Sequence, residues 1–287
     1  MNLSHNIKRI AKSLNPASKQ SIGPAIASHL ESTDHWMTIA NFRGCKLWAG
    51  PDNKIEKKIL WRGDNYDLLN FEVIHELVFP GSICFDIGAN IGVYSLIFSK
   101  LSGGSCNVHS FEPVNHIRDK LVANARLNGY DGLNVNDFAL GEAATTIDMY
   151  QVKEGVFRSG TSSFLKNEAV DAIGPDNFEV KPVSVSTLDN YVKERAISRI
   201  DFIKIDVEGF EWNVLQGAVN SVEQLRPSIL MEYDDIRHKP VSSEMRNFFE
   251  RARYTVYEVA RVGGKVCYLP WDFSKNPRCR NILCKAR

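Results

Sequence analysis

The sequence contains no run of about 20 apolar residues, the length that a helix needs to cross a bilayer. Its first ten residues, MNLSHNIKRI, include basic side chains but lack the continuous apolar core of a signal peptide. These absences predict a cytoplasmic protein with no membrane span. We expect Met1 to Leu30 to form a weakly amphipathic or partly disordered lead-in, and the sequence leaves the oligomeric state open.

A strong net charge is also missing. The chain has 35 Lys and Arg residues and 34 Asp and Glu residues, which give a formal net charge of +1. No overall field therefore draws the protein to nucleic acid or to an anionic membrane, and we expect neither as its main partner. The six cysteines form no CxxC pair, so their spacing favours neither a zinc site nor a disulfide framework and suits a reducing compartment.

The hydrophobic pattern beyond Pro80 is that of an α/β protein. Short apolar runs bounded by turns alternate with helical patterns, which predicts a mostly parallel sheet. The expected strands are Ser82 to Ile87, Asn107 to Glu112, Leu133 to Ala139, Asp201 to Asp206, Ser228 to Tyr233, Tyr254 to Ala260 and Asn281 to Lys285. The expected helices are Val93 to Leu101, Val114 to Asn128, Leu188 to Arg195, Glu211 to Asn220 and Ser242 to Arg251. The last two strands have no helix between them, so we expect a hairpin in which one strand is antiparallel to the rest.

Other segments lie outside this regular alternation. Met37 to Trp61 alternates apolar and polar residues around a GPDN turn, which predicts a β-hairpin. Apolar residues at helical spacing predict a helix over Asn70 to Phe79. An additional strand is expected at Thr145 to Tyr150. The polar, turn-rich segment Gln151 to Lys181 that follows is either a lid or binding loop or a variable surface insertion.

The segment Cys84 to Gly92, CFDIGANIG, predicts a buried strand that ends in an acid and a glycine-containing turn. Gly88 and Gly92 permit positive φ and a close approach of a ligand to the backbone, with Asn90 between them. A dinucleotide fingerprint would read GxGxxG, and Asp86 would repel a pyrophosphate. The turn therefore favours a cationic ligand such as S-adenosylmethionine, whose carboxylate can face the N-terminus of the next helix.

Acidic residues also follow the next two expected strands, at the edge where open α/β sheets bind ligands. In HSFEP, Glu112 can accept hydrogen bonds from both ribose hydroxyls of an adenosine ligand. In NDFALG, Asp137 can receive the exocyclic amine of an adenine, and Phe138 or Ala139 can line the ring. Each acid can instead be an ordinary helix cap or surface residue, so the pattern is informative only when the strand ends are taken together.

A third acidic cluster lies in KIDVEGFEW, where Asp206, Glu208 and Glu211 follow a predicted strand. Capping of the next helix is the alternative explanation for Glu208 and Glu211. Asp206, directly at the strand end, is the least easily explained in that way.

In this order, DIGANIGVYS, FEP, ALG, TLD, IKIDVEGFE and LMEY closely resemble the FkbM family of S-adenosylmethionine-dependent methyltransferases. The resemblance covers about Tyr66 to Tyr233. It implies a Rossmann-like class I methyltransferase fold, with a mostly parallel seven-stranded sheet and an antiparallel last strand. It also implies methyl transfer to a hydroxyl of a sugar, glycan or other natural product. We therefore expect an N-terminal appendage over residues 1–61 and a methyltransferase domain over residues 62–287.

Methyl transfer from a sulfonium is an in-line displacement, so holding the reacting atoms collinear supplies much of the catalysis. A hydroxyl acceptor also benefits from a base. The candidate bases are Asp206, Glu208, Glu232 and His238, and we expect Asp206 or Glu208 to face the acceptor. A divalent cation held by Asp206, Glu232, Asp234 and Asp235 is an option that the sequence does not require, so we assign no metal ligand.

The resulting assignment has two parts and leaves three alternatives. Cofactor binding is assigned to Asp86, Gly88, Asn90, Gly92, Glu112, Asp137, Ala139 and Asp206, and catalysis to Asp206, Glu208 and Glu232. The alternatives are an N-methyltransferase of the same fold, a nicotinamide-dependent oxidoreductase, and a noncatalytic module that binds S-adenosylmethionine. The expected partner is a small-molecule or glycan acceptor, and its identity is not specified by the sequence.

Overall fold

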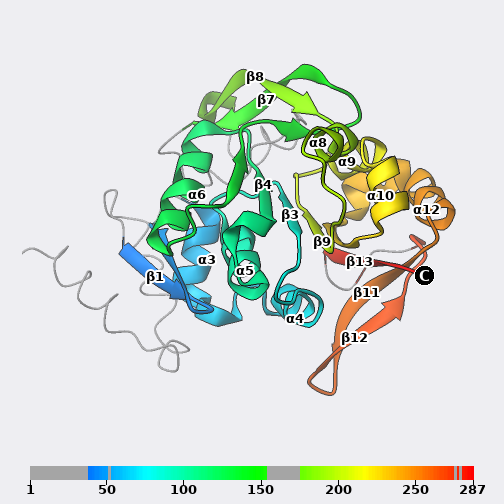
Figure 1. The fold of residues 1–287 in the computed structure, drawn as a ribbon, viewed down its shortest axis with the longest axis horizontal. Helices are drawn as coiled ribbons and strands as arrows, with labels where there is room; N and C mark the ends of the chain where they lie inside the picture. The colour runs from blue at the N-terminus through cyan, green and yellow to red at the C-terminus, as the bar shows by residue number, and fades with distance from the viewer. Residues whose placement is uncertain (1–37, 51–52, 154–174, 275–276, 278–279) are drawn as a thin grey trace, which may run out of the picture.

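An eight-stranded β-sheet with helices on both faces forms the body of the protein (Figure 1). The computed structural model describes residues 38–50, 53–153, 175–274, 277 and 280–287. Across the sheet the strands lie in the order β12-β11-β13-β10-β9-β3-β4-β5. Their bounds are β3 Cys84–Ile87, β4 Val108–Phe111, β5 Asn134–Asn136, β9 Phe202–Ile205, β10 Ser228–Glu232, β11 Tyr254–Val262, β12 Lys265–Pro270 and β13 Asn281–Ala286.

The predicted fold class is confirmed. Strands β5, β4, β3, β9 and β10 are paired in parallel, and the last strand, β13, lies antiparallel between β10 and β11. The first strand of this sheet along the chain is β3, in the middle of the sheet. The next strands, β4 and β5, lie progressively further out on one side, and the chain then returns to form β9 on the other side of β3. This reversal places a topological switch point between β3 and β9, where open α/β sheets bind ligands at the carboxyl ends of their strands.

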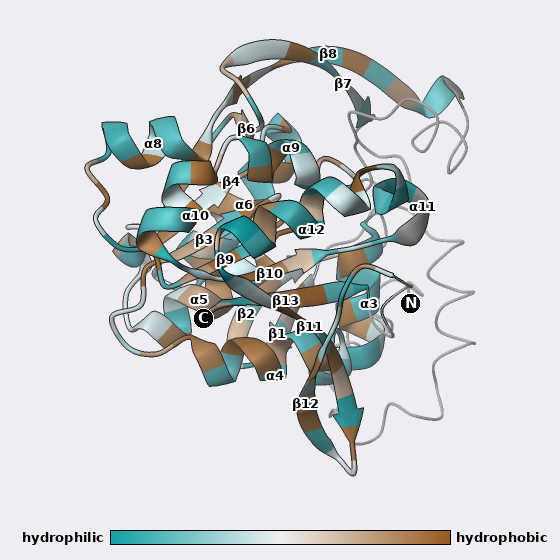
Figure 2. Cartoon of the chain, turned by 90° about the vertical axis from the view of Figure 1, so that its right-hand side faces the viewer, coloured by the Kyte–Doolittle hydropathy of each residue, from teal (hydrophilic) through white to brown (hydrophobic). Residues whose placement is uncertain are grey.

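The end of the sheet differs from the prediction. The strand β11 forms a hairpin with β12, which was not predicted. The strand β13, predicted as the hairpin partner of β11, does pair antiparallel with it, but on the side opposite β12. The hairpin turns at Gly263 and Gly264, both with positive φ, as a two-residue hairpin turn requires. The residues of β12 are all exposed or half-buried, as at a sheet edge, although Val266 to Leu269 form a short apolar run that was not predicted as a strand. Figure 2 shows this hairpin projecting from the body of the protein.

Successive residues along the central strands point to opposite faces of the sheet and feed two separate cores. Cys84 and Phe202 belong to the core shared with α4, α5 and α6, whereas Phe85 and Ile203 belong to the core shared with α8, α9, α10 and α12. The helix bounds are α4 Leu68–Leu77, α5 Val93–Ser102, α6 Asn115–Leu127, α8 Leu188–Glu194, α9 Glu211–Gln216, α10 Val219–Leu225 and α12 Ser242–Arg251. Burial on both faces explains why these strands are rich in apolar residues, with Asp86, His109 and Lys204 among the exceptions.

One predicted helix is two. The segment expected as a single helix over Glu211 to Asn220 consists of α9 and the start of α10, separated at Gly217. A Cβ atom at Gly217 would lie 1.9 Å from the carbonyl oxygen of Gly141, so this close approach needs a glycine. The helical spacing of apolar residues persists across the break, and it therefore hides the break in the sequence.

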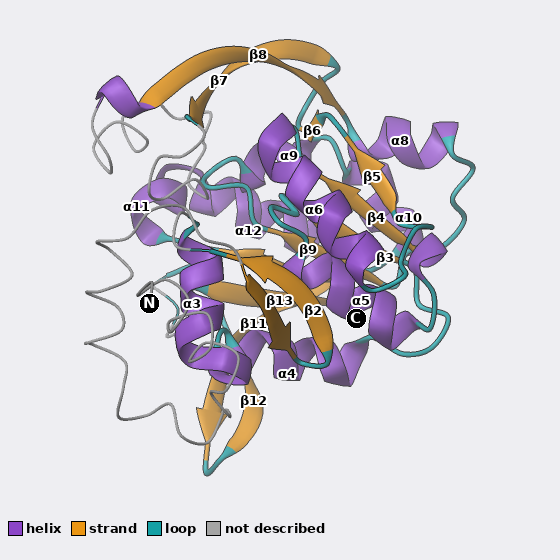
Figure 3. Ribbon diagram, turned by 90° about the vertical axis from the view of Figure 1, so that its left-hand side faces the viewer, coloured by secondary structure: helices purple, strands orange, loops and turns teal. Residues whose placement is uncertain are grey.

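The N-terminal hairpin exists but turns at a different place from the one predicted. It consists of β1 (Thr38–Phe42) and β2 (Cys45–Ala49), and it turns at Arg43 and Gly44. The second half of the predicted hairpin is instead the helix α3 (Lys54–Arg62), because Asn53 accepts hydrogen bonds from the amides of Ile55 and Glu56 and so caps it. Figure 3 shows β2 and α3 together on one side of the protein.

The hairpin is joined to the main fold. The amide of Lys46 donates to Asn128 Oδ1 and that of Trp48 to Asn124 Oδ1, each at 2.8 Å, so α6 satisfies part of the free edge of β2. Phe42 of this hairpin lies in the core of the adjacent sheet face. The division at residues 61 and 62 stays a prediction, and α3 crosses it.

A second, separate sheet lies above the carboxyl edge of the main one (Figure 2). It contains β6 (Ala139–Leu140), β7 (Thr145–Val152) and β8 (Phe178–Ser186), of which β7 and β8 form a long antiparallel ribbon. The strand expected over Leu133 to Ala139 is thus split between two sheets, and the end of the predicted loop is strand β8. Residues 154–174 of that loop lie outside the described residues, as does the lead-in over Met1 to Leu30.

None of the described helices has the length and apolar content that a membrane span requires. The cytoplasmic location expected from the sequence stays a prediction.

Candidate active site

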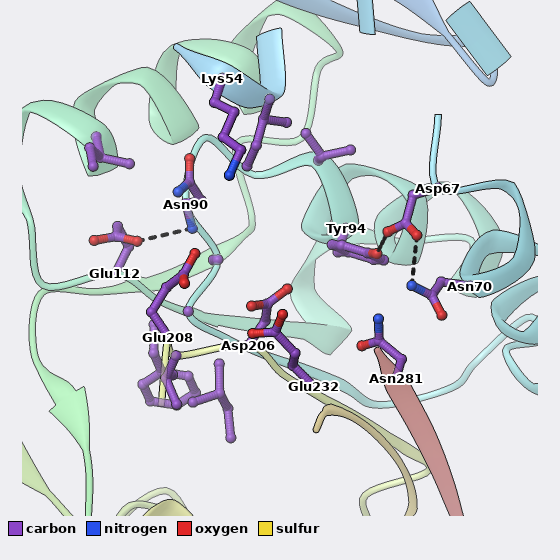
Figure 4. A pocket seen from close by; sticks show the side chains of 18 of the residues that line it. Lys54, Asp67, Asn70, Asn90, Tyr94, Glu112, Asp206, Glu208, Glu232 and Asn281 are labelled. Atoms are coloured by element: carbon purple, nitrogen blue, oxygen red, sulfur yellow. Dashed lines mark hydrogen bonds between the residues drawn. The ribbon is translucent and has the colours of Figure 1, made fainter. Parts of the chain in front are cut away.

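A cavity of about 380 Å³ opens at the carboxyl edge of the parallel strands, at the switch point between β3 and β9. This volume is in the range of small-molecule sites. The turn after β3, the loop after β9 and the ends of β4 and β10 form its floor, and α3 and α4 supply further walls. Figure 4 shows the polar side chains that converge on it.

The turn after β3 forms one part of the cavity floor. The amides of Gly88 and Ala89 donate to the carbonyl of Phe111, at 3.1 and 3.0 Å, and this anchors the turn to the end of β4. Gly88 has a φ of 81°, and a Cβ atom there would lie 1.9 Å from the carbonyl oxygen of Asp206. The glycine is therefore required by contact between two strand-end loops as well as by its own backbone conformation.

Asp86 lies beneath this turn and does not line the cavity. It is buried, and its carboxylate accepts a hydrogen bond from Ser95 Oγ on α5. Burial raises the pKa of Asp86 to about 6, although Ser95 and Lys204 act in the opposite direction. Any effect of Asp86 on a ligand is thus exerted through the turn rather than by direct contact.

Glu112 reaches the cavity from the end of β4. Its Oε2 accepts the amide of Asn90 at 3.0 Å and its Oε1 accepts the amide of Val114 at 2.9 Å. Burial raises the pKa of Glu112 to about 7 against the lowering effect of these two amides. The side chain thereby links the glycine turn to the start of the segment that leads into α6, with its oxygens at the cavity wall.

Asp206 is paired with a lysine that the sequence-based assignment omitted. Lys204 Nζ lies 3.1 Å from Asp206 Oδ2, and the Lys204 side chain is completely buried in the central strand β9. Burial opposes the charge of Lys204, but Asp206, Asp67 and Glu232 together raise its pKa above the usual value. A lysine inside the apolar run FIKI was the signal that would have identified it.

Glu208 and Glu232 lie beside Asp206 and share one cation. Arg237 Nη1 is 3.2 Å from Glu208 Oε2 and 3.3 Å from Glu232 Oε2. Burial and the neighbouring Asp206 raise the pKa of Glu208 to about 7 and that of Glu232 to about 8. Glu208 has a φ of 52°, an unusual conformation for a residue other than glycine, and it is the more accessible of the two, with 32% of its side chain exposed against 11%.

Glu211 and His238 support the loop after β9, which carries Asp206 and Glu208. Glu211 is fully buried and accepts the amide of Val207 at 3.0 Å, and His238 Nε2 lies 2.7 Å from its other oxygen. His238 Nδ1 lies 2.9 Å from the amide nitrogen and 3.0 Å from the carbonyl oxygen of Asp234, and Nε2 donates to the Glu211 carboxylate. His238 does not line the cavity and is a positioning residue rather than a base.

The opposite end of the cavity is formed by α4 and α5. Tyr94 Oη donates to Asp67, and Asn70 Nδ2 donates to the other Asp67 oxygen at 2.7 Å. Asn70 Oδ1 is buried and has no hydrogen-bond partner among the described residues. As Figure 4 shows, the Asp67, Asn70 and Tyr94 group faces the acidic cluster across the cavity.

The predicted site residues divide into two groups. Those that line the cavity are Gly88, Asn90, Glu112, Ala139, Asp206, Glu208 and Glu232. Those that do not are Asp86, Gly92 and Asp137. Gly92 instead allows α5 to pack on Leu121 of α6, because a Cβ atom there would lie 2.9 Å from that side chain. Asp137 is exposed.

The carboxylates that could hold a metal ion differ from those expected. Oxygens of Asp206, Glu211 and Glu232 lie within 4.8 Å of one another, whereas Asp234 is paired with Arg280 at 3.5 Å. Each of the three acids already has a cationic or hydrogen-bonding partner: Lys204, His238 and Arg237, respectively. Each carboxylate therefore has a partner within the protein, and the assignment of no metal ligand stays a prediction.

Comparisons with known proteins identify the family of the chain. A family model for the methyltransferase FkbM domain matches residues 86–256. The 31-O-demethyl-FK506 methyltransferase FkbM of Streptomyces tacrolimicus is 28% identical over 176 residues, which are 55% of this chain and 67% of the relative. Methyltransferase 1 of Beauveria bassiana (strain ARSEF 2860) is 24% identical over 203 residues, which are 66% of this chain and 78% of the relative.

A solved structure of methyltransferase FkbM from Methylobacillus flagellatus KT aligns with a TM-score of 0.44 and 14% identity, and covers 80% of this chain. This chain spans about half of that protein's length, at 53%. The assignment rests on the sequence match, which extends from the first turn of the cavity through the acidic strand ends to β11. The chain belongs to the FkbM family of methyltransferases, which implies the use of S-adenosylmethionine.

Proposed function

We propose that the protein transfers a methyl group from S-adenosylmethionine to a hydroxyl of a small-molecule or glycan acceptor. The observation that carries the proposal is a pair of cavity carboxyls, Glu208 and Glu232, whose pKa values burial and Asp206 raise to about 7 and about 8. Carboxyls in this range can accept a proton near neutral pH. The name of the Streptomyces relative describes an O-methylating enzyme, which supports a hydroxyl acceptor.

The cavity residues fit the methyl donor. Asn70 Oδ1 is a buried acceptor without a partner among the described residues, and with Asp67 and Asp206 it suits the donor's ammonium. Glu112 suits the ribose hydroxyls, and Ala139 belongs to an apolar part of the wall where the adenine fits. Asp86, Gly92 and Asp137, which lie outside this lining, would act on the donor only indirectly.

S-adenosylmethionine supplies the methyl group on a sulfonium, which leaves as a neutral thioether. The bond from the acceptor oxygen to the methyl carbon forms as the carbon–sulfur bond breaks, and the electron pair of that bond goes to sulfur. The hydroxyl proton passes to a carboxylate of the protein, for which we assign Glu208. Positioning of the hydroxyl in line with the methyl group by the cavity walls lowers the entropic cost of the step.

Glu208 is favoured over its neighbours for physical reasons. It is the more exposed of the two carboxyls with raised pKa, whereas Glu232 is mostly buried between Arg237 and Arg280. Asp206 is tied to the buried ammonium of Lys204, and we assign it to orient the donor. Glu208 therefore combines access to the cavity with a proton affinity suited to neutral pH.

The test uses S-adenosylmethionine with an isotopically labelled methyl group and a panel of hydroxylated and aminated small molecules and glycans. We expect label to appear in a methyl ether, identified by carbon NMR, and Glu208→Gln to lower kcat by roughly 100-fold while donor affinity stays close to that of the parent. Label on nitrogen would support the N-methyltransferase alternative. Failure of the parent to bind S-adenosylmethionine in calorimetry would rule out the proposal.

A further inference from the structure

The roof of the cavity is a row of cations on one face of α3. Lys54, Lys58 and Arg62 all line the cavity, at positions i, i+4 and i+8 of the helix. By helical rise their Cα atoms span about 12 Å. Figure 4 shows Lys54 reaching down from α3 toward the space above Asn90.

In the part of the chain that the structure describes, no ion pair includes any of the three side chains, although Lys54 and Lys58 interact electrostatically over a longer distance with Glu208 and Asp67, respectively. The acid on the same helix, Glu56, faces away from the cavity: its Oε1 lies 2.6 Å from Lys120 Nζ, and its Oε2 accepts the amide of Gly50. The helix is thus tied down through Glu56 while its cations are left facing the cavity.

The cations also repel one another. Lys58 Nζ lies 5.8 Å from the ring centre of Tyr66, half-buried at the cavity wall. Burial, and after it the charges of Lys54 and Arg62, lower the pKa of Lys58, although the carboxylate of Asp67 acts in the opposite direction. A fourth cavity cation, Arg280, adds to the lowering effect, although it is paired with Glu232 at 3.5 Å. Such an arrangement is stabilised when an anion binds.

The methyl donor does not account for the whole row. The sulfonium and ammonium of the donor suit the carboxylates of Asp206 and Asp67. The donor itself has one carboxylate. A single carboxylate cannot neutralise three cations whose helix positions span about 12 Å. The remaining positive charge therefore faces the other substrate.

We propose that the methyl acceptor carries a phosphate or diphosphate group, which Lys58 and Arg62 bind at the roof of the cavity while the hydroxyl faces the floor. The guanidinium of Arg62 can bind phosphate oxygens through two parallel hydrogen bonds, and Lys58 supplies a second positive charge beside it. This inference rests on the proposed function, because it names the class of acceptor for the same reaction.

The test is a calorimetric titration of the protein, saturated with S-adenosylhomocysteine, with inorganic pyrophosphate. Saturation keeps the donor site filled, so the anion cannot bind there. We expect the parent to bind pyrophosphate and the variants Lys58→Gln and Arg62→Gln each to weaken that binding by roughly tenfold. The matched control is Lys57→Gln, which removes the same charge from the same helix outside the cavity lining and should bind as the parent does.

Several results would overturn the inference: no pyrophosphate binding by the parent, equal weakening by Lys57→Gln, or loss of S-adenosylmethionine affinity in the Lys58 and Arg62 variants with pyrophosphate binding unchanged. Tighter binding of malonate than of pyrophosphate would assign the row to a carboxylate instead. The titration needs no turnover, so a failure of hydroxyl methylation in the labelling assay counts against the proposed function alone.

Discussion

A Cβ atom built on Gly88 would lie 1.9 Å from the main-chain carbonyl oxygen of Asp206. The turn after β3 and the acidic loop after β9 are therefore in direct backbone contact, and each fixes the position of the other. The two loops carry the residues assigned to the donor and to the base, so the geometry of the reaction depends on this contact.

Gly88→Ala should destabilise the protein more than an ordinary glycine replacement in the same backbone conformation. The control is Gly103→Ala, where φ is also positive, at 75°, but no atom lies within 4 Å of the added methyl. We expect the control to cost about 1–2 kcal/mol, from backbone strain alone, and Gly88→Ala roughly 1–3 kcal/mol more, from the clash. Urea unfolding measures both, and equal costs would show that the two loops separate easily.

The rate of methyl transfer should rise with pH to a plateau. The base must lose its proton to act, and the pKa of Glu208 is raised to about 7, so kcat should increase about tenfold per pH unit below that value and level off above it. Glu208→Gln should remove the rise. Arg237→Gln should move the midpoint upward, because the charge of Arg237 lowers the pKa of Glu208. A pH profile that is unchanged in Glu208→Gln would assign the base elsewhere.

Asp86→Asn should make unfolding less dependent on pH. The folded pKa of Asp86, about 6, lies above its ordinary value of 3.8, so the folded state holds this proton more tightly and the parent loses stability as pH rises from about 4 to about 6. The asparagine can still accept from Ser95 Oγ but does not ionise. Relative to the parent, the variant should gain at most roughly 3 kcal/mol between pH 4 and pH 7, by urea unfolding. A constant difference would contradict the burial of this carboxyl.

Glu112→Gln should weaken the binding of S-adenosylmethionine by roughly 10-fold or more, because one of its two carboxylate acceptors for the amides of Asn90 and Val114 becomes an NH₂ group. The control is Asp137→Asn, which removes an exposed carboxylate outside the cavity and should change the affinity by less than about twofold. Calorimetry separates the two. A larger loss in Asp137→Asn would restore that residue to the adenine site.

Exhaustive chelation should leave turnover unchanged. The three clustered carboxylates already have partners, among them Lys204 at 3.1 Å from Asp206 and His238 at 2.7 Å from Glu211. A divalent cation would have to displace or repel these groups. Turnover in dialysed protein with and without EDTA measures the effect, and a loss that added Mg²⁺ restores would identify a metal-dependent enzyme.

Much of the fold was predictable because it is encoded locally. The strands β3, β4, β9 and β10 are short segments with buried apolar residues, and of these four only β10 ends in an acid, Glu232. Parallel connections bring their carboxyl ends to one edge, so Glu112, Asp206, Glu208 and Glu232 could be grouped without knowledge of any distance. The edge strand β12 also contains a short apolar run, Val266 to Leu269, but none of its residues is buried and it was not predicted as a strand.

The sequence by itself determined the family, the succession of parallel strands and helices along the chain, and the identity of the acids at the strand ends. The tertiary structure decided which side chains reach the cavity: it buried Asp86 beneath the turn, left Asp137 exposed, set His238 under Glu211 and brought α3 over the site. The reason is physical. Periodicity and turn residues act over a few neighbouring residues, whereas the direction of a side chain depends on packing between segments far apart in the chain, as between Lys54 and Glu208.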